Sequence, residues 1–255
     1  MWAVATIVFL AMRLVPSDPA IVVLGDHASA EAIEAFRTEM GLNRPLIEQY
    51  WGFIGGLVRG DLGRSLITNR PNAEQIWLLF PYTFNLAVFS TLIGALIGIP
   101  LGVWAAVRKN TAVDYISRIV ALAGFSFPAF YLGVLLLLVF SIQLGWFPVL
   151  HQIREGTLSE HIYKLILPAL SLGLIQASYV TRLTRSSMLE ALGEDWVRTA
   201  FAKGDKPRTV YFKNVMKNNM IHVITANVLY KGTNQGGAIL TETVFKRPGL
   251  LTLLV

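Results

Sequence analysis

The residue types that most often perform catalysis or bind metals are few in this chain and widely spaced. Cysteine is absent, which excludes a thiolate nucleophile and a cysteine-containing zinc site. The four histidines, His27, His151, His161 and His222, form no HExxH pair. His151 and His161 are most simply polar residues of one loop, because a metal role would need a further ligand nearby. The sequence therefore predicts neither a catalytic residue nor a metal site.

Nucleotide-binding motifs are also missing from the sequence. It contains no GxxxxGK[ST] loop and no GxGxxG motif after a strand. The carboxylates Glu31, Glu34 and Glu39 are better explained as the solvated face of a helix than as acid and base groups. We therefore expect this chain to bind no nucleotide by either device and to hold no cofactor.

The densest group of charges lies in the stretch EDWVRTAFAKGDKPRTV, residues 194–210. Either acid at its start can support a short helix over Asp195–Lys203, and Gly204 can end that helix. Pro207 is tolerated in a first helical turn and can open a second helix. The stretch predicts a helix, a glycine bend and another helix, which is more order than a merely solvated loop requires.

Composition indicates that this charged stretch belongs to a membrane protein. Hydrophobic residues make up 54% of the chain, charged residues 15%, and the mean hydropathy is +0.53, whereas soluble domains carry about 25% charged residues. The net charge of +6 could suggest nucleic-acid binding. That function is excluded because the basic residues are divided among several loops rather than gathered in one aromatic-lined groove.

Four apolar runs are candidate membrane spans, since about 20 helical residues cross a hydrocarbon core. They are Thr83–Val107, Ile119–Leu150, the shorter Leu165–Thr181 and the weaker Met220–Leu240. A fifth run, Ala3–Met12, is apolar but too short to span alone. Several such runs in one chain favour membrane helices over the buried helices of a soluble core.

Gly94, Gly98 and Gly102 lie four residues apart in the first run and so share one helix face. Small residues at such a face let a second helix approach closely, because lipid supplies no hydrophobic drive and packing must hold the helices together. We predict that this face is a helix-packing surface.

A group of polar residues falls in or beside the last apolar run. A charge at membrane depth is costly and usually faces a bundle interior or a water-filled cavity. The alternative is that Lys231 reaches the interface with its long side chain, or that the helix is buried among others. Both interpretations stay open for Asn227, Lys231, Asn234, Gln235 and Glu242.

Lysine and arginine counts predict the orientation of the spans. Residues 108–118 hold three basic residues and one acid, and residues 182–217 hold eight basic residues and four acids. These two segments should face the cytoplasm. Residues 17–80 hold five arginines and eight acids, and should lie outside with the balanced segment 145–164. The external segment 17–80 predicts two helices, over Ser29–Met40 and Pro45–Val58.

Ordered blocks along nearly the whole chain resemble a known family. DWVRTAFAKG (195–204) with KNVMKN (213–218) is similar to the EAA loop of bacterial ABC-transporter permeases, in the form found in dipeptide and oligopeptide permeases of the DppB/OppB type. Further similar blocks follow in family order: RLVPSDPA (13–20), GLNRPLIEQYWGFIGGLVRGDLGRSL (41–66), IGIPLGVWAA (97–106), SFPAFYLG (126–133), LGWFPV (144–149), LPALSLG (167–173), TRLTRSSMLEALGEDWVRTA (181–200) and ETVFKRPGL (242–250).

The resemblance implies an all-α integral membrane protein with the type I ABC importer permease fold (MetI-like). Five transmembrane helices of an expected six are present, and family members carry residues beyond both ends of this chain. The implied protein is a multi-pass permease subunit of the bacterial inner membrane. Its partners would be a homologous second permease in a heterodimer, two cytoplasmic ATPase subunits that bind ATP and Mg²⁺, and an extracytoplasmic solute-binding protein.

The resemblance also assigns roles to residues. The charged stretch would be the coupling helix that sits in a cleft of an ATPase, with these contact residues: Asp195, Trp196, Arg198, Thr199, Ala200, Phe201, Lys203, Gly204 and Arg208. The chain departs from the family at Phe201, usually basic, and at Asp205, usually apolar. Other departures are His222, in place of a proline, and Lys231, Asn234 and Gln235, in place of apolar residues. The candidates for the translocation path are the five polar residues of the last apolar run: Asn227, Lys231, Asn234, Gln235 and Glu242.

The expected organisation is a first transmembrane helix at 1–16, an extracytoplasmic segment at 17–80 and a transmembrane core at 81–255 that contains the coupling loop 186–217. Relatives of this kind carry dipeptides, oligopeptides, glutathione, nickel chelates, opines or oligosaccharides, and the sequence does not choose among them. Two alternatives stay open at this level: an ion-coupled secondary transporter with Lys231 and Glu242 as coupling charges, and a membrane scaffold subunit without a translocation path.

Overall fold

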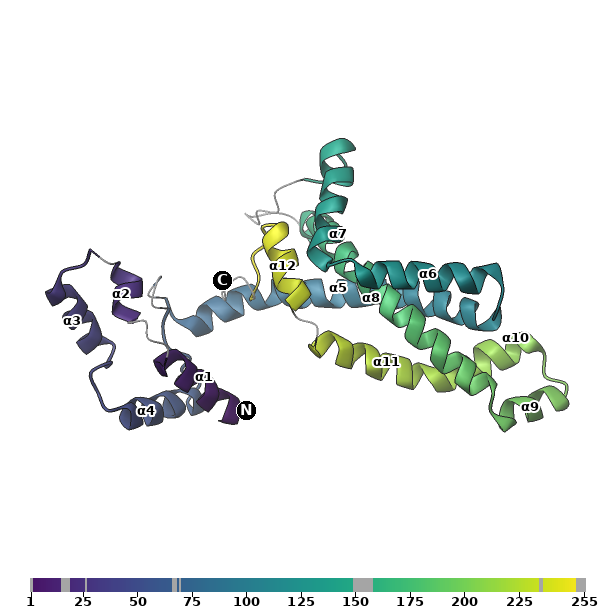
Figure 1. Cartoon of the computed structure of the whole chain (residues 1–255), viewed down its shortest axis with the longest axis horizontal. Helices are drawn as coiled ribbons and strands as arrows, with labels where there is room; N and C mark the ends of the chain where they lie inside the picture. Colours follow the sequence, from purple (N-terminus) through teal and green to yellow (C-terminus); the bar gives the residue numbers. More distant parts are fainter. Residues whose placement is uncertain are drawn as a thin grey trace. The chain divides into compact units, whose positions relative to one another are not determined.

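The computed structural model describes residues 2–14, 19–25, 27–65, 68, 70–148, 158–233 and 236–250. This part of the chain is helical, and its only β-type pairing is an isolated bridge between Arg64 and Pro71. The chain divides into two units, residues 1–78 and residues 79–255, and each is described separately. The described residues of the first unit form four helices and the first turns of a fifth, which Figure 1 labels α1 to α5.

The first unit is organised by aromatic packing between its first and fourth helices. Its helices are α1 (Trp2–Leu14), α2 (Pro19–Leu24), α3 (Ala30–Glu39) and α4 (Leu46–Val58). Phe9 of α1 packs its ring against Tyr50 and Phe53 of α4, at centroid distances of 5.4 and 5.6 Å. Ser29 caps α3 by accepting a hydrogen bond from the backbone N–H of Ala32. Both helices expected in the external segment are present within a residue of their predicted bounds.

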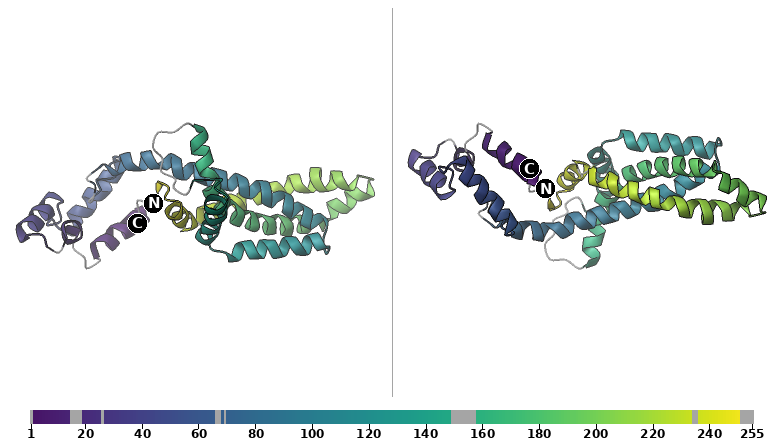
Figure 2. Two further views of the ribbon diagram at one scale, coloured as in Figure 1. Left: turned by 90° about the horizontal axis from the view of Figure 1, so that it is seen from above. Right: turned by 90° about the horizontal axis from the view of Figure 1, so that it is seen from below.

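The second unit is a bundle around the long helix α8. Its helices are α5 (Asn72–Val107), α6 (Ala112–Ser126), α7 (Ala129–Leu136) with the π-helical continuation η1 (Leu137–Gln143), α8 (Leu158–Leu192), α9 (Asp195–Ala202), α10 (Pro207–Thr209), the π-helix η2 (Val210–Val215), α11 (Met216–Thr233) and α12 (Gly236–Val244). Helix α8 contacts α6, α7, α11 and α12. Figures 1 and 2 show α6, α8 and α11 running alongside one another, with α9 and α10 at one end.

Two described helices are long and apolar enough to cross a membrane, namely α5 and α8. The pair formed by α6 and α7–η1 would be a third crossing, but it is bent by 99° at its break. The candidate span Ile119–Leu150 is therefore not one continuous helix but is broken where α6 meets α7. The physical reason is Pro128, whose ring disfavours a helical backbone at the preceding residue, and Phe127 is indeed extended at φ −84° and ψ 130°.

The expected weak span Met220–Leu240 is represented by α11 and α12, and α1 is a shorter apolar helix. The two segments assigned to the cytoplasm by charge lie at the same end of the second unit. There, Val107 at the end of α5 packs against the cluster that contains Val197 of α9. This shared end is what the alternating orientation of the spans requires.

Candidate functional site

The charged stretch forms the expected helix, bend and second helix. Helix α9 follows the extended residue Glu194 and ends at Ala202 with Lys203 as its C-cap, and Gly204 then adopts φ +88°. The backbone N–H of Gly204 donates to the carbonyl of Phe201 at 3.0 Å, and that of Asp205 to the carbonyl of Ala200 at 3.2 Å. This left-handed conformation is costly for any residue with a Cβ. Pro207 occupies the first turn of α10, as its spacing predicts.

Helix α9 has one face anchored in the bundle and one face open. Val197 is 1% exposed and packs in a cluster with residues of α5, α8 and η2, including Val103, Met188 and Val210. Ala200 packs against the same cluster. Val197 was not among the residues predicted for this site, although its spacing of three from Ala200 in a charged helix is the signal of a buried stripe.

The open face of α9, with the bend and the start of α10 that follow it, carries the remaining residues expected to contact an ATPase. Trp196 and Phe201 are each 39% exposed, and Phe201 meets Tyr211 edge to face at 6.1 Å between ring centroids. Arg198 lies 3.3 Å from Asp195 on the same helix, and both side chains are largely in solvent. An ion pair with this exposure adds little stability. The exposed Asp195, Thr199, Lys203, Gly204 and Arg208 complete the surface.

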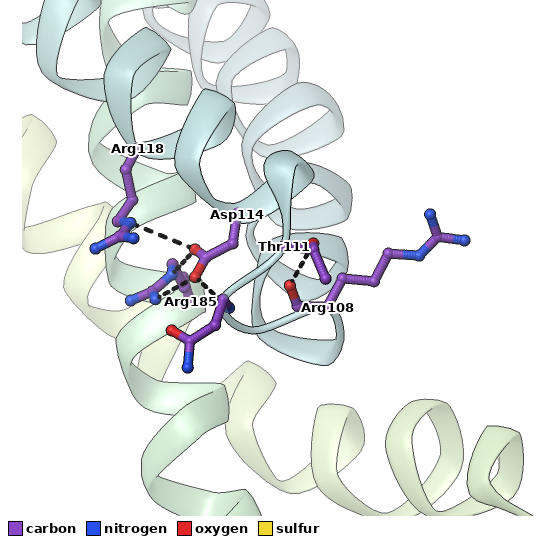
Figure 3. Close-up of polar contacts among 6 residues, drawn as sticks. Arg108, Thr111, Asp114, Arg118 and Arg185 are labelled. Atoms are coloured by element: carbon purple, nitrogen blue, oxygen red, sulfur yellow. Dashed lines mark hydrogen bonds and ion pairs between the residues drawn. The ribbon is translucent and has the colours of Figure 1, made fainter.

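A buried ion pair joins α6 to α8 near this end of the bundle (Figure 3). Asp114 is fully buried and accepts two hydrogen bonds from Arg185, from Nε at 2.5 Å and from Nη2 at 2.9 Å. It also accepts the backbone N–H of Asn110 at 3.0 Å, while Arg118 is 3.6 Å away. Two-point contacts of this kind are among the strongest charge-assisted hydrogen bonds.

This ion pair was not predicted from the sequence, because its two members are 71 positions apart. The only local signal was that Asp114 is the one acid in the basic segment 108–118. Since α8 leads through Gly193 into α9, the pair links the first turn of α6 to the helix that carries the candidate coupling helix.

The three glycines of α5 lie directly against α8. A Cβ on Gly98 would be 2.7 Å from the carbonyl oxygen of Ala177 and 2.7 Å from Cβ of Val180. On Gly102 it would be 2.7 Å from the carbonyl oxygen of Thr181. On Gly94 it would meet the side chain of Gln176 at 2.9 Å. The face defined by these glycines is therefore occupied by α8 at a distance that leaves no room for a methyl group.

Two of the candidate path residues have partners inside the bundle. Asn227 of α11 is 5% exposed and accepts a hydrogen bond from Gln176 of α8, which is 2% exposed. Buried amides are stable only when they are paired in this way. Lys231 lies on α11, but its side chain is outside the described part of the structure, as are both Asn234 and Gln235. Their role in lining a path stays a prediction.

Glu242 of α12 is fully enclosed by the end of the chain and α5. The hydroxyl of Thr83 donates to its Oε1 at 2.7 Å and accepts the backbone N–H of Leu250 at 2.8 Å. Arg247 is 4% exposed and its guanidinium donates to the carbonyl of Tyr82 at 3.4 Å. A Cβ on Gly249 would overlap the Glu242 carboxyl group. Glu242 thus holds α12 and residues 247–250 against α5, and its place in a translocation path stays a prediction.

No group of three or more metal-ligating side chains occurs among the residues searched, which are those the structure describes. The features brought together in the second unit are therefore mechanical and polar rather than catalytic. They are the half-anchored helix α9, the Asp114–Arg185 pair, the glycine seam between α5 and α8, and two buried polar contacts that tie α11 and α12 to the bundle.

Comparison with known proteins places the chain in a family. Residues 98–255 match the family described as binding-protein-dependent transport system inner membrane component, and residues 1–87 match the N-terminal family of such membrane components. The glutathione transport system permease protein GsiC of Escherichia coli strain K12 is 41% identical over 255 residues, which is 100% of this chain and 81% of the relative.

The permeases of the same name from Shigella dysenteriae and Shigella flexneri are 41% and 40% identical, again over 100% of this chain and 81% of the relative. Such identity over the full chain, together with a family match over more than half of it, is decisive for membership. The chain belongs to the family of binding-protein-dependent transport system inner membrane components, and is a membrane-spanning translocation subunit of an ABC importer.

Proposed function

We propose that this permease carries glutathione or a similarly small peptide, and that it is driven by an ATPase docked on α9. The glutathione transport permeases that it resembles at 41% identity support the substrate class. A heterodimer with a second permease, two ATPase subunits and a solute-binding protein complete the proposed importer. Because the chain belongs to the ABC permease family, an ion-coupled transporter and an inert scaffold are no longer competitive alternatives.

The observation that carries the coupling proposal is the division of α9 into an anchored and an open face. Val197 is buried in the bundle, while Trp196 and Phe201 on α9 remain 39% exposed. Large aromatic and arginine side chains are the usual anchors of protein interfaces. Trp196, Arg198 and Phe201 supply both types within one helix of eight residues.

Movement of α9 would be transmitted to the membrane helices through rigid contacts. Val197 packs with Val103 of α5 and Met188 of α8, so a push on α9 acts on both long helices. Closely packed side chains cannot absorb such displacement, because protein interiors are as dense as organic crystals. The Asp114–Arg185 pair then carries the displacement of α8 to α6.

The proposed path for the solute lies beside α11 and α12, where Asn227, Lys231, Asn234, Gln235 and Glu242 are the candidate residues. The buried Gln176–Asn227 contact supports a polar interior between α8 and α11. Polar side chains at this depth suit a solute with amide and carboxylate groups, because such groups need hydrogen-bonding partners wherever water is excluded.

Retention of the ATPases tests the coupling proposal. With Trp196→Ala, the ATPase subunits of the same system should dissociate from the purified permease about 30-fold more readily, because interface anchors contribute about 2 kcal/mol or more. Lys109→Ala is the matched control, since Lys109 is exposed in the turn between α5 and α6. Equal retention in both variants would contradict a docking role for α9.

Uptake of labelled glutathione into proteoliposomes tests the substrate class separately. The complete importer, with its binding protein outside and ATP inside, should accumulate glutathione and lose this uptake without ATP. ATP hydrolysis that responds to the binding protein but moves no glutathione would retain the coupling proposal and overturn the substrate.

A further inference from the structure

A small pocket between α6 and α8 is bordered by arginine side chains. It has a volume of about 140 Å³ and is lined by Ala121, Leu122 and Thr181, together with Arg118, Arg182 and Arg185. Its floor is apolar and its border is basic. A pocket with these two parts fits a ligand that has an anionic end and an apolar end.

The charges around the pocket do not cancel. Arg185 is committed to Asp114 by two short hydrogen bonds, and Arg118 is a weaker neighbour of the same carboxylate at 3.6 Å. For Arg182 no carboxylate lies within ion-pair distance in the part of the chain that the structure describes. Three guanidinium groups thus line the pocket, and the one carboxylate recorded as an ion-pair partner of any of them is that of Asp114, within the part of the chain that the structure describes.

Aromatic rings hold two of these arginines at the apolar surface. The guanidinium of Arg118 lies 4.5 Å from the ring centroid of Tyr115, and that of Arg182 lies 5.4 Å from that of Phe125. Tyr115, Leu122 and Phe125 are each at least half exposed on α6. In a membrane-spanning chain, such a surface is apolar enough to lie against hydrocarbon, and it carries Arg118 and Arg182 beside it.

We propose that this pocket binds the headgroup of an anionic phospholipid. The segments 108–118 and 182–217 carry the basic excess expected of the cytoplasmic side, and the cytoplasmic leaflet is the one rich in anionic lipid. Arg182, with help from Arg118, binds the phosphate of the headgroup. An acyl chain then runs along Leu122 and Phe125 toward the bilayer centre.

The lipid would act on the segment that links α6 to α8. A phosphate at Arg118 and Arg182 lies next to the Asp114–Arg185 pair, so it adds charge-assisted contacts between the same two helices. Binding an anionic lipid therefore strengthens the connection through which α8 displaces α6. The family membership of this chain does not depend on this inference, which rests on the pocket and its charges.

Lipid retention tests the proposal on the full chain purified with its partner subunits. The complex is incubated with vesicles of equimolar phosphatidylglycerol and phosphatidylcholine, and bound lipid is counted by native mass spectrometry. Phosphatidylglycerol should be retained in preference to phosphatidylcholine. Arg182→Gln should lower the retention of phosphatidylglycerol about fivefold, because one arginine near an anionic membrane surface strengthens binding by about that factor.

Arg108→Gln is the matched control, since it removes the same charge at the same end of the bundle. Figure 3 shows the Arg108 side chain directed away from Asp114, and it stacks instead on Trp104 at 5.5 Å. The Arg108→Gln variant should retain as much phosphatidylglycerol as the unchanged protein. Both variants are expected to keep the thermal stability of the unchanged protein, because both side chains are exposed.

Three results would overturn the proposal. The first is equal retention of both lipids, and the second is equal loss in Arg182→Gln and Arg108→Gln. The third is displacement of the lipid by millimolar inorganic phosphate, which would indicate a site for the free anion. Leu122→Cys gives one further check, because the chain has no cysteine of its own. Crosslinking of this cysteine to the second permease would show that a protein helix covers the pocket and would contradict the proposal. The absence of a crosslink would support a lipid-exposed pocket.

Discussion

Replacing Gly98 by alanine should loosen the bundle, because α8 occupies the space that the new methyl group needs. Its Cβ would be 2.7 Å from both the carbonyl oxygen of Ala177 and Cβ of Val180. Favourable contacts between carbon atoms lie near 3.5–4.0 Å, so a shift of roughly 1 Å is required. Neither neighbour can rotate away, since one is backbone and the other is the branched carbon of a stiff side chain.

The cost follows from these distances. Overpacking of a dense interior costs about 1–3 kcal/mol, and two rigid neighbours place Gly98→Ala near the upper end. Alanine recovers about 1 kcal/mol over glycine in a helix, so the expected net loss is about 2 kcal/mol. A loss of this size lowers the Tm of a chain of this length by about 4–8 °C.

Gly94→Ala and Gly52→Ala complete a graded series. At Gly94 the close atom is Cγ of Gln176, at 2.9 Å, and a flexible side chain can move, so we expect a fall of less than about 3 °C. At Gly52, inside α4, a Cβ would meet nothing within 4 Å, and the Tm should stay level or rise. Thermal unfolding in detergent, followed by tryptophan fluorescence, ranks the three variants. If Gly98→Ala and Gly52→Ala unfold at the same temperature, the α5–α8 contact is not as close as described.

Three further predictions concern coupling and topology. Val197→Ala should weaken the packing of α9 on the bundle by about 1–3 kcal/mol, because it removes buried methyl groups. ATP hydrolysis should then continue while uptake falls. A proportional loss of hydrolysis and uptake would contradict the role of Val197 in coupling. Asp114→Asn leaves Arg185 without its carboxylate and should lower the free energy of unfolding by about 3 kcal/mol. A variant with Arg at position 114 and Asp at position 185 should recover part of this loss, measured as Tm and as uptake per ATP. No recovery in the exchanged variant would argue against the ion pair. A cysteine at Glu160 should react with an impermeant thiol reagent from outside and one at Lys206 should not, and the reverse pattern would invert the orientation.

Helix bounds in the charged stretch and the external segment were predictable because their causes are local. Ser29 caps its helix through a neighbour three residues away, and Gly204 ends α9 through bonds that span a few residues. Capping and left-handed glycine geometry depend on the residues themselves, whatever packs around them. The family resemblance added the roles of these elements, which geometry alone does not assign.

The break at Pro128 was also encoded locally, but it was read as part of one span because the run is uniformly apolar. The residue before a proline avoids helical backbone, and Phe127 shows this. Hydropathy measures whether a segment can lie in lipid and carries no information on its direction. The 99° bend between α6 and α7 was therefore missed although its cause stands in the sequence.

Membrane location, helical class and the shape of the coupling segment thus follow from residue types and near neighbours along the chain. The contacts that give these helices a mechanism come from pairs far apart in sequence. Asp114 meets Arg185 across 71 positions, and Thr83 meets Glu242 across 159. Many arginines could have paired with Asp114, and only the packing of α6 on α8 brings one within 2.5 Å. Glycine spacing indicated a packing face, but only the folded bundle placed α8 upon it.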